Sequence, residues 1–320
     1  MSRVLVTGGA GFIGSNLALA LEKLGHDVVV LDDFSVGHFE NLRGFKGDVV
    51  SADAFRAEDW VARVGGVEAI FHQAAITDTT VMDQKRMMEA NVEAFRNVLD
   101  FAAQTGVPKV VYASSAGVYG RGGVPMREDQ EPAPANIYAF SKKVMEKVAS
   151  DFVVETPSVK VVGLRYFNVF GPGESHKAKA ASMIWQLSRQ MLAGKRPRIF
   201  KHGEQFRDFI YVKDVVEANL KAWEAKDSGV FNVCTGQKST FNRMIEVLNE
   251  TLGLELEPDY FDNPYSFYQD ETLGAPALAE RALGFKAKFT IETGIRDYME
   301  SVGSVGKGTK RHAIASGNPS

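Results

Sequence analysis

Three side chains stand at spacings that could move a proton to and from a hydroxyl group. Tyr138 and Lys142 are four residues apart in a stretch with helical periodicity, so they would share one face of a helix. A nearby ammonium group stabilises a phenolate and lowers the pKa of a phenol from about 10. Such a phenolate is a suitable general base, and Ser115, at the end of an earlier apolar run, could hydrogen-bond the same oxygen. The spacing alone also fits an exposed Tyr–Lys pair without a catalytic role, so the choice between the two interpretations depends on the surrounding elements.

A glycine-rich turn follows the first apolar run of the chain, with Gly8, Gly11 and Gly14 at intervals of three. The first glycine permits a tight turn, the second lets a pyrophosphate approach the backbone, and the third lets a helix pack close to the strand. The helix that follows would offer free N–H groups to the phosphates. Asp32 and Asp33 end the second apolar run, where a carboxylate can accept hydrogen bonds from an adenosine ribose. The pattern predicts a dinucleotide site, and the alternative is a glycine turn in another α/β fold.

The identity of the dinucleotide depends on the residues after the second strand. The carboxylate of Asp32 favours NAD, because it would repel the 2′-phosphate of NADP. The next loop offers His38 and Arg43 as phosphate partners, so NADP remains an alternative. An oxidised nicotinamide would add its positive charge to that of Lys142 and further favour the Tyr138 phenolate. Hydride could then leave the carbon whose hydroxyl loses its proton, while the lysine also holds the nicotinamide ribose.

Along the chain, short apolar runs, in which polar residues do not alternate with apolar ones, are followed by longer stretches of helical periodicity. The predicted strands are residues 4–7, 27–31, 69–72, 109–113, 159–165, 208–212 and 231–234. The predicted helices are residues 12–24, 54–64, 83–103, 137–153, 214–225, 240–252, 271–283 and 291–300. Strands without alternation are buried on both faces, as in a parallel sheet with helices on each side. The pattern predicts an α/β fold, a Rossmann doubly wound parallel sheet with a smaller α/β C-terminal substrate lobe.

The order of these elements predicts two lobes and a tail. Residues 1–165 are expected to form the NAD(P)-binding Rossmann domain, with its sheet completed by segments within residues 205–235. Residues 166–302 are expected to form mainly the substrate-binding lobe, which would cover the sheet edge where the loops after parallel strands gather. Residues 303–320 are rich in Gly, Ser and Lys and lack periodicity, which predicts a disordered tail.

Composition argues against several other classes of protein. With 37 basic and 40 acidic residues among 320, the net charge of -3 disfavours nucleic-acid binding through a basic face. The single cysteine, Cys234, cannot form an intramolecular disulfide, and no histidines or carboxylates show metal-ligand spacing, so no metal is expected. No apolar stretch is long enough to span a membrane and no signal peptide is recognisable, which predicts a cytoplasmic protein without a membrane partner.

Together these motifs resemble the extended short-chain dehydrogenase/reductase superfamily, specifically its nucleotide-sugar epimerases and dehydratases, over about residues 2–302. The supporting segments are Phe71-His72-Gln73-Ala74-Ala75, Asn91, Arg165-Tyr166-Phe167-Asn168-Val169-Phe170-Gly171-Pro172 and Arg207-Asp208-Phe209-Ile210-Tyr211-Val212. The resemblance implies cofactor contacts from Gly8, Gly11, Phe12, Ile13, Gly14, Asp32, Asp33, Asp53, Gln73, Ala74, Ala75, Asn91, Lys142 and Val169.

Within the superfamily the chain is most similar to the ADP-L-glycero-D-manno-heptose 6-epimerases. The segments that carry this likeness are Thr79-Thr80, His176-Lys177 and Tyr268-Gln269. By this resemblance Lys177 becomes a second base, and the implied catalytic residues are Tyr138, Lys142, Ser115 and Lys177. The implied substrate contacts are Thr79, Asn168, Lys177, Arg207 and Tyr268. A phosphate-binding or surface lysine is the alternative for residue 177.

The resemblance implies an epimerase that inverts one sugar carbon by transient oxidation to a ketone and re-reduction with bound NAD(P). Ala116 and Gly117 follow Ser115 where dehydratases carry an acid, which disfavours elimination. Lys179 and Gln186 stand where the heptose epimerases would have a serine and a histidine, which leaves the identity of the sugar open. The alternative is a UDP-hexose 4-epimerase of the glucose/galactose type. A net NAD(P)-dependent sugar-nucleotide reductase and a non-catalytic dinucleotide-binding sensor rank below both.

The resemblance also suggests the partners of the chain. The implied ligand is a nucleotide-diphosphate sugar, with no nucleic acid involved. The loop after the second strand lacks the lysine that accompanies NADP in the heptose epimerases, in keeping with NAD. Helices 83–103 and 137–153 are similar to those through which relatives dimerise, so a homo-oligomer, a dimer or higher, is expected.

Overall fold

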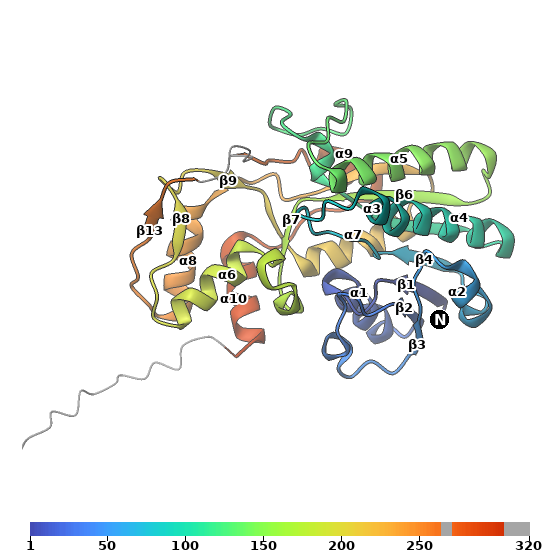
Figure 1. The fold of residues 1–320 in the computed structure, drawn as a ribbon, viewed down its shortest axis with the longest axis horizontal. Helices are drawn as coiled ribbons and strands as arrows, with labels where there is room; N and C mark the ends of the chain where they lie inside the picture. The colour runs from blue at the N-terminus through green and yellow to red at the C-terminus, as the bar shows by residue number, and fades with distance from the viewer. Residues whose placement is uncertain (264–270, 304–320) are drawn as a thin grey trace, which may run out of the picture.

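The computed structural model describes residues 1–263 and 271–303 (Figure 1). A larger lobe holds a central sheet between helices, and a smaller lobe lies beside it, toward the left of the figure. The predicted tail, residues 303–320, lies outside the described residues except for Gly303.

The larger lobe is built on one sheet of seven parallel strands. They are β1 (Arg3–Thr7), β2 (Asp27–Asp32), β3 (Asp48–Ser51), β4 (Ala69–His72), β5 (Lys109–Ser115), β6 (Lys160–Tyr166) and β11 (Gly229–Val233). Their order is β11-β6-β5-β4-β1-β2-β3, and every neighbouring pair is parallel. The order reverses between β1 and β4, as in doubly wound dinucleotide-binding folds. The predicted fold class is therefore confirmed.

Two strands differ from the sequence prediction. Strand β3 was not expected, because it is a short edge strand in which only Val50 is buried, so its apolar signal is weak. The predicted strand 208–212 forms β10 (Phe209–Tyr211), which pairs with β7 (Asn168–Phe170) instead of joining the central sheet. Of the segments within residues 205–235, only β11 therefore joins the central sheet, next to β6.

Helices cover both faces of the sheet and enclose a separate hydrophobic core on each. One face is covered by α1 (Phe12–Lys23), α7 (Val212–Glu224) and α9 (Ala277–Leu283). The other is covered by α2 (Ala57–Val64), α4 (Ala94–Thr105) and α5 (Ile137–Glu155). Successive residues of a strand point to opposite faces, so Val4 and Val6 enter the first core and Leu5 enters the second.

A π-helical turn interrupts the predicted helix 83–103. Helix α3 (Gln84–Met88) leads into this turn, η2 (Glu89–Glu93), which continues into α4. Single π turns inside helices occur frequently at functional sites. This one places Asn91 in the interior, where it is fully buried.

The smaller lobe has its own hydrophobic core. Its helices are α6 (Met183–Leu192), α8 (Phe241–Leu252) and α10 (Ile291–Ser301). Its paired strands are β8 (Arg198–Phe200) with β13 (Asp259–Phe261) and β9 (Phe206–Arg207) with β12 (Ser239–Thr240). The predicted helix 271–283 begins only at Ala277, because the residues before it form bridges to Phe206 and Met126.

In the described part of the chain, three short 3-10 helices lie in connecting segments. They are η1 (Phe39–Leu42), η3 (Ala116–Tyr119) and η4 (Ser175–Ala180). Among the helices that the structure describes, none is long and apolar enough to cross a membrane. Residues 1–263 and 271–303 also contain no group of three or more His, Cys, Asp or Glu side chains placed to hold a metal ion.

Candidate active site

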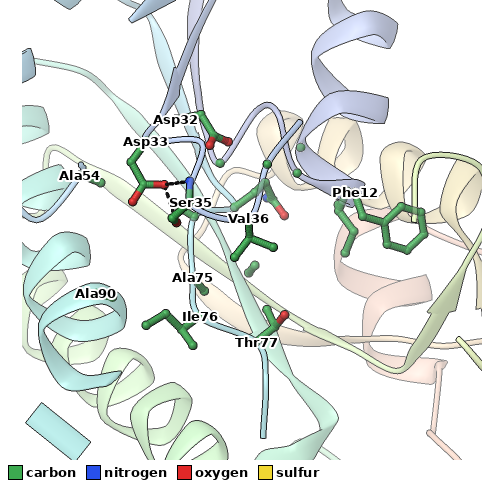
Figure 2. Close-up of a pocket in the computed structure, with 18 of the residues that line it drawn as sticks. Phe12, Asp32, Asp33, Ser35, Val36, Ala54, Ala75, Ile76, Thr77 and Ala90 are labelled. Atoms are coloured by element: carbon green, nitrogen blue, oxygen red, sulfur yellow. Dashed lines mark hydrogen bonds between the residues drawn. The ribbon is translucent and has the colours of Figure 1, made fainter. Parts of the chain in front are cut away.

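A cavity of about 470 Å³ opens at the carboxyl ends of β1, β2, β4 and β5 (Figure 2). It lies where the strand order reverses, which is the usual ligand position in an open α/β sheet. The predicted site residues that line it are Gly8, Gly11, Phe12, Ile13, Gly14, Asp32, Asp33, Asp53, Gln73, Ala74, Ala75, Ser115, Tyr138, Lys142, Val169 and Lys177. The fold therefore brings together residues from both halves of the chain.

The glycine turn packs tightly on one side and is open on the other. A Cβ on Gly8 would lie 2.6 Å from the nitrogen of Ala74, and one on Gly14 would lie 2.1 Å from the carbonyl oxygen of Gly8. A Cβ on Gly11 would meet only that same oxygen, at 3.2 Å. Helix α1 starts immediately after Gly11 without a side-chain cap, and its first three residues line the cavity. This arrangement fits the diphosphate of a dinucleotide.

Two carboxylates stand beside this turn. Asp32 accepts hydrogen bonds from the backbone nitrogens of Ala10 (2.9 Å) and Phe34 (2.8 Å), which orients its carboxylate at the cavity wall. Burial raises the pKa of Asp32, and these two hydrogen bonds oppose the rise. Asp33 accepts from the backbone nitrogen and hydroxyl of Ser35, as Figure 2 shows. Both acidic side chains fit ribose hydroxyls and oppose a 2′-phosphate.

Neither basic residue that the sequence suggested as a cofactor phosphate partner lines the cavity. His38 and Arg43 do not line it: the His38 ring lies 5.3 Å from the ring of His176, and Arg43 pairs with Glu40 at the surface. Arg56 and Arg86 do line it, and sequence analysis missed both. Arg56 follows the unpredicted strand β3, so recognising that strand would have placed this arginine at the ligand edge.

The predicted catalytic residues meet at one end of the cavity. Ser115 ends β5, and its Oγ accepts a hydrogen bond from the nitrogen of Gly117 (3.1 Å). Tyr138 lies in the first turn of α5, and its hydroxyl hydrogen-bonds Ser115. Lys142 lies one turn later, donates its Nζ proton to the carbonyl oxygen of Ala113 (2.8 Å), and lies 5.9 Å from the centre of the Tyr138 ring.

Burial dominates the protonation of this pair. It raises the pKa of Tyr138, although the hydrogen bond from Ser115 acts in the opposite direction. Burial also lowers the pKa of Lys142 to about 7, with Glu146 opposing the change. The sequence predicted a phenol made more acidic by the lysine. In the protein alone the phenol is less acidic than usual, because desolvation outweighs the other effects.

Lys177 reaches the same cavity from η4. Its Nζ lies 5.7 Å from the centre of the Phe12 ring, at the start of α1. Burial lowers the pKa of Lys177, while the nearby carboxylate of Glu174 raises it. Glu174 is itself buried and accepts hydrogen bonds from the nitrogen of Gly171 (3.1 Å) and from the nitrogen (2.5 Å) and hydroxyl (2.8 Å) of Ser182. These bonds hold the loop that carries Lys177, and sequence analysis missed this glutamate.

Asn91 supports the cavity wall from behind instead of lining it. Its side chain exchanges two hydrogen bonds with the backbone of Ile76 (2.8 and 3.1 Å) and donates to the hydroxyl of Ser141 (2.9 Å), next to Lys142. Ile76 and the neighbouring Thr77 form part of the wall (Figure 2). In this structure Asn91 thus positions cavity residues without facing the cavity.

Three of the predicted substrate residues, Thr79, Asn168 and Arg207, do not line this cavity. Thr79 is exposed beyond the wall formed by Thr77. Asn168 donates hydrogen bonds to the carbonyl of Asp208 (3.0 Å) and the hydroxyl of Thr272 (2.9 Å). Arg207 donates to the carbonyl of Phe206 and lies 5.9 Å from the ring of Phe241 in the smaller lobe. The last predicted contact, Tyr268, lies outside the described residues.

The site and fold define an NAD-dependent enzyme of a known family. Residues 4–234 match the NAD dependent epimerase/dehydratase family, so the chain belongs to that family. This confirms the predicted place among the extended short-chain dehydrogenase/reductase epimerases and dehydratases. It also confirms NAD as the cofactor, which agrees with the open glycine turn and the two carboxylates beside it.

Solved structures of sugar-nucleotide epimerases are similar to the whole chain. One is the ADP-L-glycero-D-manno-heptose-6-epimerase of Helicobacter pylori, with 40% identity and a TM-score of 0.88 over 95% of this chain and 97% of that one. Another is the UDP-glucose 4-epimerase of Thermotoga maritima, with 32% identity and a TM-score of 0.87 over 94% and 98%. A third is the UDP-N-acetylglucosamine 4-epimerase of Methanobrevibacter ruminantium, with 30% identity and a TM-score of 0.88 over 95% and 98%.

Proposed function

We propose that the protein is an ADP-L-glycero-D-manno-heptose 6-epimerase. The observation that carries this proposal is that two proton-transfer groups on different elements, Tyr138 on α5 and Lys177 on η4, line the same cavity. The 40% identity to the heptose epimerase of Helicobacter pylori supports it. Inversion at a carbon outside the sugar ring is well served by two bases, because the ketone can rotate about one bond while the ring stays bound.

In this mechanism Tyr138 takes the proton of the sugar hydroxyl as a phenolate, which the positive charges of Lys142 and of the oxidised nicotinamide would favour once the cofactor is bound. Ser115 hydrogen-bonds the same sugar oxygen. Bound NAD supplies the chemistry of accepting a hydride from that carbon and returning it to the other face. After rotation of the ketone, Lys177 donates a proton to the ketone oxygen from the side opposite Tyr138, which forms the new hydroxyl. For the other epimer the two residues exchange roles. Burial favours this exchange, because the lowered pKa of Lys177 makes its neutral form accessible.

The same chain's residues would hold the cofactor. The glycine turn and the start of α1 fit the diphosphate, Asp32 and Asp33 fit the adenosine ribose, and Lys142 fits the nicotinamide ribose beside Tyr138. We further propose that residues 1–165 act mainly as the cofactor domain and residues 166–302 as the substrate lobe. Asn168, Arg207 and Tyr268 are then substrate contacts from that second lobe, and Thr79 is a substrate contact from the first.

A UDP-hexose 4-epimerase is the second candidate. It is favoured by the 32% and 30% identities to UDP-glucose and UDP-N-acetylglucosamine 4-epimerases. Inversion at a ring carbon requires the whole sugar to turn over, so one base, Tyr138, could serve both directions. Lys177 would then bind substrate without transferring a proton.

The test is to incubate the protein with ADP-heptose and, separately, with UDP-glucose, and to follow inversion by NMR. Inversion at carbon 6 of the heptose is expected, and inversion of the hexose at carbon 4 would support the second candidate. Tyr138→Phe should abolish turnover while sparing affinity for NAD, because it removes only the hydroxyl. No inversion of either sugar by the native protein would contradict both candidates.

We also propose that the protein acts as a homo-oligomer in the cytoplasm. On the helices expected to form the contact, Phe140 of α5 is 46% exposed and Val154 of α5 is 79% exposed, which leaves apolar surface for a second copy. The free, buried thiol of Cys234 is in keeping with a reducing compartment. Light scattering would test the first statement, since a monomer at micromolar concentration would contradict it.

A further inference from the structure

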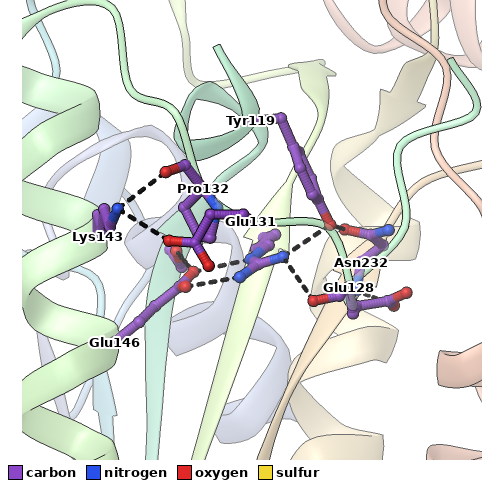
Figure 3. A network of polar contacts seen from close by, with 9 residues as sticks. Tyr119, Glu128, Glu131, Pro132, Lys143, Glu146 and Asn232 are labelled. Carbon is purple, nitrogen blue, oxygen red and sulfur yellow. Dashed lines mark hydrogen bonds and ion pairs between the residues drawn. The ribbon is translucent and has the colours of Figure 1, made fainter. Parts of the chain in front are cut away.

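A buried ion pair joins α5, the helix that carries Tyr138 and Lys142, to strand β6 (Figure 3). Glu146 is one turn beyond Lys142 on α5, and Arg165 is near the end of β6. Two parallel hydrogen bonds join them, from Nε to Oε1 (2.9 Å) and from Nη2 to Oε2 (2.7 Å). Their side chains are only 10% and 5% exposed. A two-pronged pair of this kind fixes orientation as well as charge.

The same carboxylate also reaches the end of β5. Ser114 donates its hydroxyl to Oε1 of Glu146 (2.5 Å), and this serine directly precedes Ser115. On the other side of the helix turn, Lys142 donates to the carbonyl oxygen of Ala113. Ala113 and Ser114, the two residues before Ser115, are therefore hydrogen-bonded to α5 at Lys142 and Glu146, which sets where Ser115 lies relative to the helix.

Arg165 extends this network away from the cavity. It donates from Nη1 to the hydroxyl of Tyr119 (2.8 Å), and that hydroxyl donates to the side-chain oxygen of Asn232 on β11 (2.7 Å). Figure 3 shows the chain of contacts from α5 to β11. Neither Glu146 nor Arg165 lines the cavity, so neither is placed to touch a ligand.

We propose that Glu146 is a positioning residue for the reaction, which holds α5, β5 and β6 in register and provides the negative charge that keeps Lys142 protonated in its buried site. The proposal rests on the proposed roles of Tyr138 and Lys142 but not on the identity of the sugar.

The charges around Lys142 explain why its protonated form needs a nearby negative charge. Lys142 is 1% exposed, and burial lowers its pKa to about 7, while Glu146 acts in the opposite direction. The neighbouring titratable groups do not replace Glu146. His72 on β4 is neutral because burial lowers its pKa to about 3, Tyr138 on α5 is neutral because burial raises its pKa, and Arg165 on β6 is positive. Without Glu146, Lys142 would lose its proton at a lower pH.

Site-resolved carbamylation by cyanate tests this without any substrate, because cyanate modifies only the neutral amine. In the full chain, Glu146→Gln should accelerate modification of Lys142 at pH 6 by about three- to fivefold, because loss of the negative charge leaves a larger fraction of the amine neutral. Glu155→Gln is the matched control, since it removes an exposed carboxylate from the same helix. The exposed Lys195 should react equally in all proteins.

The activity readout separates this role from a purely structural one. With Glu146→Gln the rate should fall at neutral pH and recover as the pH is lowered, whereas general loosening of the site would lower it at every pH. If the unpaired Arg165 prevents folding, Glu146→Gln with Arg165→Gln removes both charges and should displace the carbamylation profile in the same direction. The proposal is overturned if Lys142 reacts at the same rate in the native protein and in a folded variant, including the case in which neither reacts. If Glu146→Gln accelerates carbamylation of Lys142 as expected but the native protein epimerises neither sugar, the result counts against the proposed function alone.

Discussion

Replacing Lys177 with methionine tests whether the protein uses two bases. Methionine keeps an unbranched apolar stem but removes the amine, so the packing near Phe12 changes little. If Tyr138 is the base for one epimer and Lys177 for the other, the variant should still oxidise the first epimer but not the second. Loss of a general base slows the affected step by about 10²–10⁴-fold. That corresponds to about 2.7–5.4 kcal/mol in the barrier.

The assay is a single turnover with each purified epimer of ADP-heptose, in which reduction of the bound NAD is followed by its absorbance. Lys177→Met and Tyr138→Phe should show opposite preferences between the two epimers. Only the neutral amine can accept a proton, so the native rate with the Lys177-dependent epimer should rise as the pH rises through the lowered pKa of Lys177. Lys195→Met removes an exposed lysine and should change neither rate. Equal loss with both epimers, or no loss, would refute the assignment of two bases.

Three further variants test the cavity and the core. Gly14→Ala should weaken NAD binding at least about tenfold by calorimetry, because its Cβ would lie 2.1 Å from a backbone oxygen. Gly66→Ala is the control and should bind NAD normally, because its Cβ would meet nothing within 4 Å. Equal NAD affinities of the two variants would contradict the close packing of the turn. Glu174→Gln removes the charge that raises the pKa of Lys177, so the Lys177-dependent rate should begin to rise at a lower pH than in the native protein. A pH profile identical to that of the native protein would show that the charge of Glu174 does not affect Lys177. Leu17→Ala removes a fully buried side chain of α1 and should lower the free energy of unfolding by about 2–5 kcal/mol in urea titrations, whereas a loss below about 1 kcal/mol would mean that the site collapses around the deletion.

Local pattern was sufficient for the elements that carry the predicted site. The turn from β1 into α1, and the placement of Tyr138 and Lys142 on one helix face, depend on residues within a few positions of one another. The parallel character of the sheet also followed from uninterrupted apolar runs, and seven parallel strands confirm it. Edge strand β3 was missed because it buries only Val50, and Arg56 after it was not recognised as a cavity residue, although Asp53 was.

Other features of the protein depend on contacts between distant parts of the chain. Three examples are the pairing of β10 with β7, the hydrogen bonds of Asn91 to the cavity wall at Ile76, and the contact of η4 with α1. Each joins residues far apart in sequence, so no local periodicity predicts it. Protonation is the clearest case. The sequence shows that Tyr138 and Lys142 are neighbours, but the degree of burial sets their pKa values, and burial is a sum over every element packed around them. Residue types and spacing therefore determined which groups could do chemistry, and the tertiary structure decided how much water and charge each of them meets.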